Sequence, residues 1–570
     1  MFKRKRIFKL ALNYIIMYIT HFMALKEEIK KIFKGDVDDS AETLEKYSRD
    51  ASLFKVRPQI VVFPKDTDDV KNLVAYAASA RSAGEDISLT ARSAGTDMSG
   101  GALTESVIVE FTKYFNRLKE LGSNYAVVEP GMFYRDFEAE TLKKNLLLPS
   151  YPASRELCAV GGMVANNSGG EKTLNYGKTE NYIEELKMVL KDGNEYAFKK
   201  LTFGELEEKK AMNTLEGEIY RKVYDLVSRN YDLLKKAKPK VTKNSSGYYL
   251  WNVLDWDKKT FDLTRLIAGS QGTFGLITEI KFRLIRPEPA SRLLIIFLKD
   301  LKPLATLTET ILKYKPESFE SYDDNTFKLA IKFFPEILHR VKGSFLRIVL
   351  GLLPEAWLLL SGGMPKLVLL AEFIAATAEE ASQKAEAARA ELKKKFNFKM
   401  RVTKSDEEGK TFWVIRRESF NLLRQHVRGF RTAPFIDDLS VPAYALPEFL
   451  PKLYAILNQY KLIYTIAGHV GDGNFHIIPL MNLKDPQAKN IISELSKKVY
   501  DLTLAFGGSI TAEHNDGIIR TPFLKQAYGE EVYKLFEETK KIFDPEGIFN
   551  PGKKVGGTLD YALSHLDIEE

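Results

Sequence analysis

Two short segments near the C-terminus concentrate side chains that can bind a metal ion and move a proton. The segment AGHVGDGNFH places a tight Gly-Asp-Gly turn between His469 and His476. If the flanking residues form a hairpin, both imidazoles share one side of it, an arrangement that suits a divalent metal. The segment GGSITAEHNDG adds Glu513 and, directly after it, His514. Two histidines and one carboxylate would leave coordination positions open for a substrate.

The distribution of histidine along the chain supports this interpretation. The chain contains seven histidines, and three of them fall in these two segments. A lone histidine is more often a structural residue than a ligand, so neither segment decides the matter alone. The clustering beside Glu513 favours a metal site with a neighbouring base.

Three glycine-rich segments earlier in the chain are suited to bind phosphate through backbone N–H groups. They read ARSAGTDMSGG, AVGGMVANNSGGEKTLNYGKT and AGSQGTFGLITE. Small residues allow successive N–H groups to converge on one anion without a helix. One such loop could be a flexible surface turn, but three predict a long phosphate-bearing ligand that lies against backbone. None has the three spaced glycines of a nicotinamide dinucleotide site.

In combination the three loops resemble those of the FAD-binding fold shared by vanillyl-alcohol oxidase, D-lactate dehydrogenase and the glycolate oxidase flavoprotein subunit. The resemblance covers roughly residues 50–556 and includes the phrase FDPEGIFNPGK near the C-terminus. It implies that the first loop grips the pyrophosphate and that the second lies along the adenosine and the isoalloxazine. The residues it assigns to FAD are Arg92, Ser93, Ala94, Gly95, Thr96, Asp97, Ser99, Gly100, Pro152, Gly161, Gly162, Asn166, Ser168, Gly269, Ser270, Gly272, Gly275, Ile277 and Asn550.

The chain departs from this family pattern at a few positions. Ser93 and Ala94 stand where the first loop of relatives usually has more glycine, and Gln271 stands where the third usually has Glu. No histidine lies between His21 and His339, so a covalent link from a histidine of the flavin domain is excluded. We expect FAD to be bound non-covalently, with Cys158 a candidate for attachment only in principle.

The two C-terminal segments resemble those of metal-dependent 2-hydroxy-acid dehydrogenases in this flavin family. The resemblance implies that His469, His476 and Glu513 hold a divalent metal, zinc first, and that His514 accepts the hydroxyl proton. Relatives usually read EHGIG where this chain reads EHNDG.

The substrate carboxylate needs a cation, and WVIRRESF offers Arg416 and Arg417. A guanidinium binds a carboxylate through two parallel hydrogen bonds. Arg416 aligns with a substrate-binding arginine of the D-2-hydroxyglutarate dehydrogenase branch, whereas a lysine of that branch aligns with Ile436. The missing second cation favours a monocarboxylate such as D-lactate or glycolate.

The elements that must position these residues follow from hydrophobic periodicity. Up to Pro287, β-branched runs such as QIVVFP and LITEIKFRLI predict strands, and residues 66–80 and 216–236 predict helices. Beyond Pro287, predicted strands, including FIDDLSV, YTIAGHV and NFHIIPL, alternate with helices. We expect an α+β protein, with a two-part FAD-binding domain of vanillyl-alcohol-oxidase type and a C-terminal α/β cap with an antiparallel sheet. The expected divisions are residues 1–22, a basic and apolar extension; 23–288, the FAD-binding domain; 289–540, the cap; and 541–570, a segment that returns to the flavin domain.

Composition excludes several classes of function. A single cysteine excludes a disulfide framework, a cysteine-rich zinc site and an iron–sulfur cluster bound by this chain alone. The net charge of +8 falls to +3 without the five cations among residues 3–9. The remainder shows no basic face with stacking aromatics, so we expect no nucleic-acid partner.

Two apolar segments bear on localisation. The run LALNYIIMYI is too short to span a membrane, which takes ~20 apolar residues, and no cleavage site for secretion follows it. A weak interfacial anchor and a start codon placed too early are the two remaining interpretations. Residues 345–360 are expected to form a buried helical insertion, with a membrane contact as the alternative. We expect a cytoplasmic protein, with peripheral contact at the inner membrane face as the variant.

These patterns favour FAD-dependent oxidation of a D-2-hydroxy acid to the 2-oxo acid, with hydride transfer to flavin N5. Electrons would pass to a separate iron–sulfur protein, a quinone or a cytochrome. Three alternatives stay open: a D-2-hydroxyglutarate dehydrogenase, a transferase like the ether-lipid synthases, and a non-catalytic flavoprotein subunit. The transferases carry a run of consecutive histidines that this chain lacks, and a subunit that only carries electrons needs neither a metal nor a base.

Overall fold

The structure, a computed structural model, describes residues 25–326, 328, 364–410, 412–414, 416 and 429–569. The expectations for residues 1–22 and 345–360, and the second candidate anchor Arg417, lie outside these residues. In the described part of the chain, no helix combines the length and the apolar character needed to cross a membrane.

The N-terminal part of the chain builds two sheets. In the first, of order β1-β2-β4-β3, β4 pairs in parallel with both β2 and β3. Its central strands are continuous apolar runs because both of their faces are covered, one of them by helix α3, which Asp66 caps through the N–H of Asp69. The elements are β1 (Asp36–Asp38), α2 (Ala41–Tyr47), β2 (Ile60–Phe63), α3 (Thr67–Ser82), β3 (Leu89–Arg92) and β4 (Val107–Glu110).

The second sheet has seven strands in the order β5-β6-β11-β7-β8-β10-β9. Strand β11 alternates buried and half-buried residues, as expected for a sheet with helices on one face. The strands are β5 (Leu118–Leu121), β6 (Tyr125–Val128), β7 (Ile183–Val189), β8 (Glu195–Thr202), β9 (Leu254–Asp255), β10 (Thr260–Asp262) and β11 (Leu276–Arg283). The helices are α4 (Tyr134–Leu142), α5 (Val160–Asn166), α6 (Thr173–Tyr176), α7 (Phe203–Ala211), α8 (Leu215–Arg229), α9 (Tyr231–Ala237) and α10 (Thr264–Ile267).

The helix expected over residues 216–236 is two helices, because Asn230 leaves the helical conformation between α8 and α9. Asn230 has φ −111° and ψ 20°, so the backbone bends there. The apolar face of α8 still packs on the second sheet through Ile219, Tyr220 and Val223.

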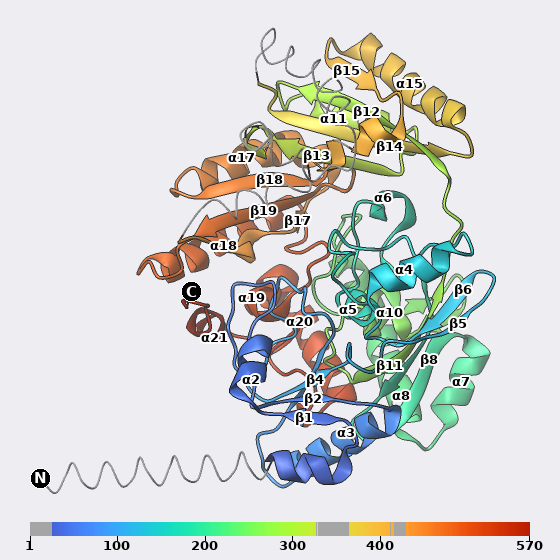
Figure 1. Ribbon diagram of the computed structural model, residues 1–570, viewed down its shortest axis with the longest axis vertical. Helices are drawn as coiled ribbons and strands as arrows, with labels where there is room; N and C mark the ends of the chain where they lie inside the picture. The colour runs from blue at the N-terminus through green and yellow to red at the C-terminus, as the bar shows by residue number, and fades with distance from the viewer. Residues whose placement is uncertain are drawn as a thin grey trace, which may run out of the picture.

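The C-terminal part forms an eight-stranded sheet whose strand pairs are all antiparallel. It forms the upper layer in Figure 1, and we call it the cap. Its strands are β12 (Ala290–Leu298), β13 (Ser318–Asp323), β14 (Leu367–Ala375), β15 (Lys399–Val402), β16 (Arg431–Thr432), β17 (Leu439–Ser440), β18 (Ile463–His469) and β19 (Asn474–Met481). Its helices include α11 (Leu304–Leu312), α15 (Ala378–Lys395), α17 (Leu446–Leu457) and α18 (Ala488–Ala505).

The strand expected over residues 435–441 is not continuous. A 3₁₀ turn, η3 (Pro434–Ile436), is followed by Asp437 and Asp438, and only Leu439–Ser440 pair as β17. Asp438 has φ +69°, a left-handed conformation that a strand cannot accommodate. The break places two buried carboxylates, those of Asp437 and Asp438, where a continuous strand was predicted.

After the cap, the chain crosses back to the N-terminal part. Helix α19 (Gly517–Arg520) leads into α20 (Leu524–Phe543), which packs in the second core through Val532, Leu535 and Phe536. Helix α21 (Leu559–Ser564) then lies near the C-terminus, between the upper and lower layers (Figure 1). The expected division at residue 541 stays a prediction; the return to the N-terminal core is under way within α20.

Candidate active site

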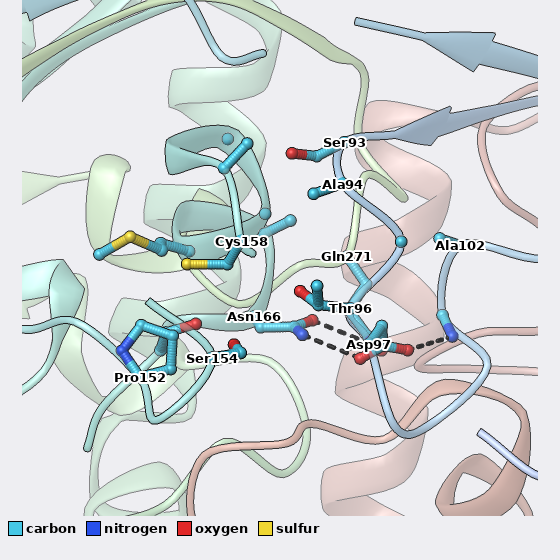
Figure 2. Close-up of a pocket in the computed structure, with 18 of the residues that line it drawn as sticks. Ser93, Ala94, Thr96, Asp97, Ala102, Pro152, Ser154, Cys158, Asn166 and Gln271 are labelled. Carbon is cyan, nitrogen blue, oxygen red and sulfur yellow. Dashed lines mark hydrogen bonds between the residues drawn. The ribbon is translucent and has the colours of Figure 1, made fainter. Parts of the chain in front are cut away.

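A cavity of about 260 Å³ lies between the N-terminal domain and the cap. All three glycine-rich loops line it, and so do His476, Glu513 and His514. Figure 2 shows the wall that the glycine-rich loops form. The residue types that predicted a phosphate-bearing cofactor and those that predicted acid–base chemistry therefore face one space.

Asp97 shapes the first loop from inside. Its Oδ2 accepts hydrogen bonds from the N–H of Ser99 (3.2 Å) and of Gly101 (2.6 Å), and from the Ser99 hydroxyl (2.8 Å). Its Oδ1 accepts a bond of 2.9 Å from Nδ2 of Asn166, in the second loop. One carboxylate thus folds its own loop and joins it to the next (Figure 2).

Gln271 completes this network from the third loop. Its Nε2 donates to Oδ1 of Asn166 and to Oγ of Ser99, both at 3.2 Å. Its Oε1 accepts the N–H of Gly517, at the start of α19, at 2.8 Å. The relative positions of the three loops therefore depend on one side-chain carboxylate, that of Asp97, and on two side-chain amides, those of Asn166 and Gln271.

Arg92 lines the cavity, but its guanidinium is committed to the protein. It donates to the carbonyl oxygens of Tyr47 (3.2 Å) and Arg49 (2.7 Å) and lies over the Tyr47 ring. Burial lowers the pKa of Arg92 below its ordinary value. Gly95 must lack a side chain, because a Cβ there would lie 2.4 Å from the Arg92 guanidinium.

The residues assigned to FAD fall into two groups. Those that line the cavity are Arg92, Ser93, Ala94, Gly95, Thr96, Asp97, Pro152, Gly161, Gly162, Asn166, Ser168, Gly272, Gly275 and Ile277. Ser99, Gly100, Gly269, Ser270 and Asn550 are absent from the lining and support it from behind. Asn550, for example, donates to the carbonyl oxygens of Gly101 (2.8 Å) and Gln271 (2.7 Å).

The hairpin of β18 and β19 brings His469 and His476 to one side, as the spacing predicted. His476 pairs with Ala467, two residues before His469, and the two ring centroids lie 5.3 Å apart. The turn between them needs Gly473, which has φ +65° and whose Cβ would lie 1.9 Å from the Val441 carbonyl.

Both rings converge on one oxygen of Glu513. Nε2 of His469 lies 2.9 Å, and Nε2 of His476 3.2 Å, from Oε1 of Glu513. Two ligands of a single zinc ion lie about 3 Å apart, since each is ~2.0–2.2 Å from the metal. Oε2 of Glu513 is buried without a hydrogen-bond partner among the described residues. Two of the three ligand separations are therefore short enough for a single zinc ion.

A second overlapping set offers ligand atoms that all lie within 4.8 Å of one another: Asp438, His476, Glu513 and His514. It shares His476 and Glu513 with the predicted triad but leaves out His469. We favour the triad, because Oδ1 of Asp438 already accepts a hydrogen bond from Asn474 and its Oδ2 is committed to backbone. Metal binding itself stays a prediction.

Asp438 fixes the backbone that carries Glu513 and His514. Its Oδ2 accepts the N–H groups of Ala512 (2.9 Å), Glu513 (2.8 Å) and His514 (2.7 Å), and the Thr511 hydroxyl (2.6 Å). Burial alone would raise the pKa of Asp438, but the imidazoles of His514 and His476 help to lower it.

Asp437 lies between the imidazoles of His476 and His514. Its Oδ1 is 3.2 Å from Nδ1 of His476, and its Oδ2 is 2.7 Å from Nδ1 of His514, although the latter pair lacks hydrogen-bond alignment. Burial disfavours the charged rings, but Asp437 and Glu513 raise the pKa of His476 to about 10. Against the same burial, Asp438 and Asp437 raise the pKa of His514.

Arg416 does not line the cavity. Its guanidinium pairs with Oε2 of Glu320, and Oε1 of the same carboxylate lies 2.6 Å from Nδ1 of His469. Arg416 is therefore placed one contact behind the predicted metal ligand. Its role as the substrate anchor stays a prediction.

The sequence interpretation passed over Glu320, Asp437, Asp438 and Lys243. Lys243 is fully buried, with Nζ 3.0 Å from the Gly170 carbonyl oxygen and 3.8 Å from Oε2 of Glu513. A signal existed for the aspartates, because two adjacent acidic residues inside the apolar run FIDDLSV are costly to bury without a task. Glu320 and Lys243 carry no such local signal.

Two sequence-family profiles match the chain. One, described as a FAD binding domain, matches residues 58–198, and the other, described as the C-terminal domain of FAD linked oxidases, matches residues 288–554. The first contains two of the three glycine-rich loops, and the second contains both histidine segments.

Curated relatives match nearly the whole chain at low identity. A D-2-hydroxyglutarate dehydrogenase of Pseudomonas putida is 26% identical over 535 residues, which are 91% of this chain and 50% of that protein. The chain thus spans about half the length of that relative. A D-2-hydroxyglutarate dehydrogenase of Stutzerimonas stutzeri is 25% identical, covering 93% of this chain and 98% of that protein. Glycolate oxidase subunit GlcD of Bacillus subtilis is 25% identical, covering 90% and 93%.

Solved structures share the fold. The 4-ethylphenol oxidase of Gulosibacter chungangensis superposes with a TM-score of 0.65 at 16% identity, over 95% of this chain and 97% of that one. An alkyldihydroxyacetonephosphate synthase superposes with a TM-score of 0.62 at 14% identity, over 93% and 84%. The predicted fold of vanillyl-alcohol-oxidase type is confirmed. Profiles, relatives and fold agree that the chain belongs to the family of FAD-linked oxidases.

Proposed function

We propose that the protein oxidises a small D-2-hydroxy acid to the 2-oxo acid with FAD. One observation carries the proposal: a single cavity is lined by the glycine-rich loops and by His476, Glu513 and His514. A protein that only relayed electrons through FAD would need no buried cluster of imidazoles and carboxylates at that cavity. The names of the relatives, which are dehydrogenases and an oxidase of 2-hydroxy acids, support the same reaction class.

The residues divide the chemistry between them. His469, His476 and Glu513 would hold a divalent ion, zinc first, which when bound lowers the pKa of the substrate hydroxyl. His514 lies at the cavity wall with 23% of its side chain exposed and takes the hydroxyl proton. Bound FAD supplies the acceptor for the hydride from C2.

The cavity favours a monocarboxylate such as D-lactate or glycolate. Among the described lining residues, the only arginine or lysine is Arg92, which is committed to the Tyr47 and Arg49 carbonyls. Ile436, where the D-2-hydroxyglutarate branch has lysine, is buried in the cap core. Among the described residues of the cavity, a second substrate carboxylate thus finds no free cation. D-2-hydroxyglutarate is the alternative, and the names of two of the relatives favour it.

Flavin bleaching tests the proposal directly. The purified protein should be yellow and release FAD on heating or acidification. It should be mixed anaerobically with glycolate and with the D- and L-isomers of lactate and 2-hydroxyglutarate. The flavin should bleach fastest with D-lactate or glycolate. Fastest bleaching by D-2-hydroxyglutarate would transfer the assignment to the alternative, and bleaching by none of these acids would reject the reaction class.

We further propose that reduced FAD passes its electrons to a separate acceptor. The single cysteine cannot build an iron–sulfur cluster in this chain, so the partner would be an iron–sulfur protein, a quinone or a cytochrome. The name of the Bacillus subtilis relative as a subunit supports a partner protein. Turnover of the holoenzyme with a soluble quinone, with cytochrome and with dioxygen would separate these acceptors.

The proposed location is the cytoplasm, with peripheral contact at the inner membrane face as the variant. The five cations among residues 3–9 support an anionic surface as the contact. Fractionation of cells that express the full chain and a variant starting at Met23 would decide between the two locations.

A further inference from the structure

The loop that carries His514 is held from both of its ends, and we call residues 512–517 the His514 loop. On the cap side, Oδ2 of Asp438 accepts the N–H groups of its first three residues, at 2.7–2.9 Å. On the flavin-domain side, Nδ2 of Asn515 donates to the Gly269 carbonyl oxygen at 3.0 Å. The loop thus bridges the two parts of the molecule, and His514 lies between the two attachments.

A buried ion pair forms a further attachment on the flavin-domain side. Oδ2 of Asp516 lies 2.8 Å from Nζ of Lys554, and both side chains are fully buried. The same oxygen accepts the N–H of Gly247 at 2.8 Å. Lys554 donates its two other protons to the carbonyl oxygens of Ser245 and Gly247, both at 2.9 Å. Each of the three ammonium protons therefore has an acceptor, and three distant segments of the chain meet at one side chain.

The energetics of burial oppose any movement of this attachment. A buried charge is tolerated only with a partner, and removing one member of a buried pair leaves the other uncompensated. Among the described residues, Lys554 is the only cation that pairs with the Asp516 carboxylate. Burial lowers the pKa of Lys554, and Asp516 opposes that shift. The His514 loop therefore cannot move away from the flavin domain without separating a buried ion pair.

The backbone of Lys554 supports the same interpretation. Lys554 has φ +67°, a conformation that glycine adopts without strain and that other residues rarely adopt. Such a conformation persists where the surrounding contacts hold it in place. Here the contacts are the three hydrogen bonds of the ammonium and a bond of 3.0 Å from the Lys554 N–H to the Thr521 hydroxyl.

We propose that Asp516 and Lys554 are positioning residues, which fasten the His514 loop to the flavin domain and thereby set how far the imidazole of His514 reaches into the cavity. His514 lines that cavity, three residues from the nearest fixed cap contact and two from Asp516. The inference rests on the proposed function for the task of His514. The fastening of the loop does not depend on it.

A double-mutant cycle tests the pair in the FAD-loaded full chain, by hydrogen–deuterium exchange and by anaerobic flavin bleaching with saturating D-lactate. In Lys554→Met, the amides of the His514 loop and of residues 245–247 should exchange faster than in the parent. Flavin reduction should slow by ~10²-fold, the cost of a displacement of about 1 Å. Asp516→Leu combined with Lys554→Met should recover most of both losses, because no buried charge is left without a partner.

A second buried pair of lysine and aspartate provides the matched control. Lys540 pairs with Asp544 and donates to the carbonyl oxygens of Thr273 (2.6 Å) and Phe549 (2.7 Å). Its ammonium thus has the same kinds of acceptor as that of Lys554, but none of these contacts involves the His514 loop. Lys540→Met should lower the melting temperature, as Lys554→Met does, and leave both the exchange of the loop and the reduction rate of bound FAD at the parental values.

Three results would overturn the inference. They are parental exchange of the His514 loop in Lys554→Met, an equal loss of rate in Lys540→Met, and additive losses in the double variant, which would mean that the two residues act independently. If the parent reduces no flavin, the proposed function fails, while the exchange of the loop still decides whether the pair fastens it.

A milder variant keeps the test decisive if Lys554→Met does not fold. Asp516→Asn retains an oxygen that accepts from Gly247 and Lys554 but removes the charge, and a hydrogen bond to a neutral acceptor is about half as strong. The His514 loop should still exchange faster than in the parent. Parental exchange in Asp516→Asn would then contradict the inference.

Discussion

The two walls of the cavity are built on opposite principles. The flavin-side wall consists of backbone and small residues, held by the uncharged or singly charged side chains of Asp97, Asn166 and Gln271. The cap-side wall presents His476, Glu513 and His514. Behind them lie four more buried ionisable groups: Glu320, Asp437, Asp438 and His469. The flavin-side wall depends on the small volume of its residues, and the cap-side wall depends on the charge and protonation of its side chains.

This difference decides how each wall fails. A substitution in the glycine-rich wall acts through volume, because a Cβ meets neighbouring atoms or the cofactor. A substitution in the cap cluster removes one member of a mutually compensating set and leaves its partners buried without compensation. We therefore expect glycine variants to lose FAD or stability, and cluster variants to keep FAD and lose chemistry.

The largest expected effect comes from removing the metal. Chelation should abolish turnover and leave the flavin spectrum unchanged, because the predicted ligands His469, His476 and Glu513 belong to the cap wall. Elemental analysis before chelation should find about one divalent ion per chain, as a single site requires. Added Zn²⁺ should restore turnover. If the metal-free protein turns over at the parental rate, the hypothesis that these three residues hold a catalytic metal is wrong.

The next effect concerns His514. His514→Ala should retain FAD and metal and slow flavin reduction by ~10²–10⁴, the usual contribution of a positioned base. Only the neutral ring accepts a proton, so the parental rate should fall as the pH drops through the pKa of His514. Asp438 and Asp437 raise that pKa, so in the metal-free protein the ring becomes charged at a higher pH than an ordinary histidine.

Rapid mixing with D-lactate across pH, in parent and variant, measures this. The variant should lose the pH dependence along with the rate. If His514→Ala bleaches its flavin at nearly the parental rate and with the same pH profile, His514 only packs its turn and is not the base.

A smaller effect separates two adjacent glycines of the flavin wall. A Cβ at Gly161 would lie 2.6 Å from the Pro130 carbonyl oxygen, whereas one at Gly162 would meet only Ser93, at 3.5 Å. Gly161→Ala should therefore destabilise the protein by ~1–3 kcal/mol through overpacking. Gly162→Ala should keep the melting temperature of the flavin-free protein and lower its FAD occupancy.

Thermal melts of the flavin-free variants and flavin absorbance of the reconstituted ones check both outcomes. Equal melting temperatures for the two variants would contradict the assignment of Gly161 to protein packing. Full FAD occupancy in Gly162→Ala would show that the cofactor does not approach that residue closely.

The same difference explains what could be predicted from sequence. A glycine-rich loop can be recognised from a short stretch of sequence, because the residues that form this wall are neighbours in the chain. The two hairpin histidines, His469 and His476, could also be predicted from sequence, because the Gly-Asp-Gly turn between them fixes their relative positions. Glu320 and Lys243 were not, because they reach Glu513 and His469 only through tertiary contacts between distant segments.

The strand expected over residues 435–441 shows the converse limit. The segment FIDDLSV was predicted to be a strand, but Asp438 has a left-handed backbone conformation, and its carboxylate accepts the N–H groups of Glu513 and His514. A periodic pattern cannot report a backbone break whose compensation comes from another part of the chain. Asp437 and Asp438 were missed for this reason.

The smallest expected effect tests the network that holds the flavin wall in register. Gln271 donates from Nε2 to Asn166 and Ser99 and accepts the Gly517 N–H on Oε1. Gln271→Glu conserves the acceptor but replaces the donor by a second acceptor beside Oδ1 of Asn166, which cannot turn without losing its bond to Asp97. The loss of the two hydrogen bonds that Nε2 donates should cost about 1–2 kcal/mol, roughly five- to thirtyfold in FAD affinity. Gln271→Met, which removes donor and acceptor together, is the comparison, and flavin titration of the stripped proteins measures all three. Tighter FAD binding by Gln271→Glu would show that the wall is set by the Gly517 contact and not by the amide network.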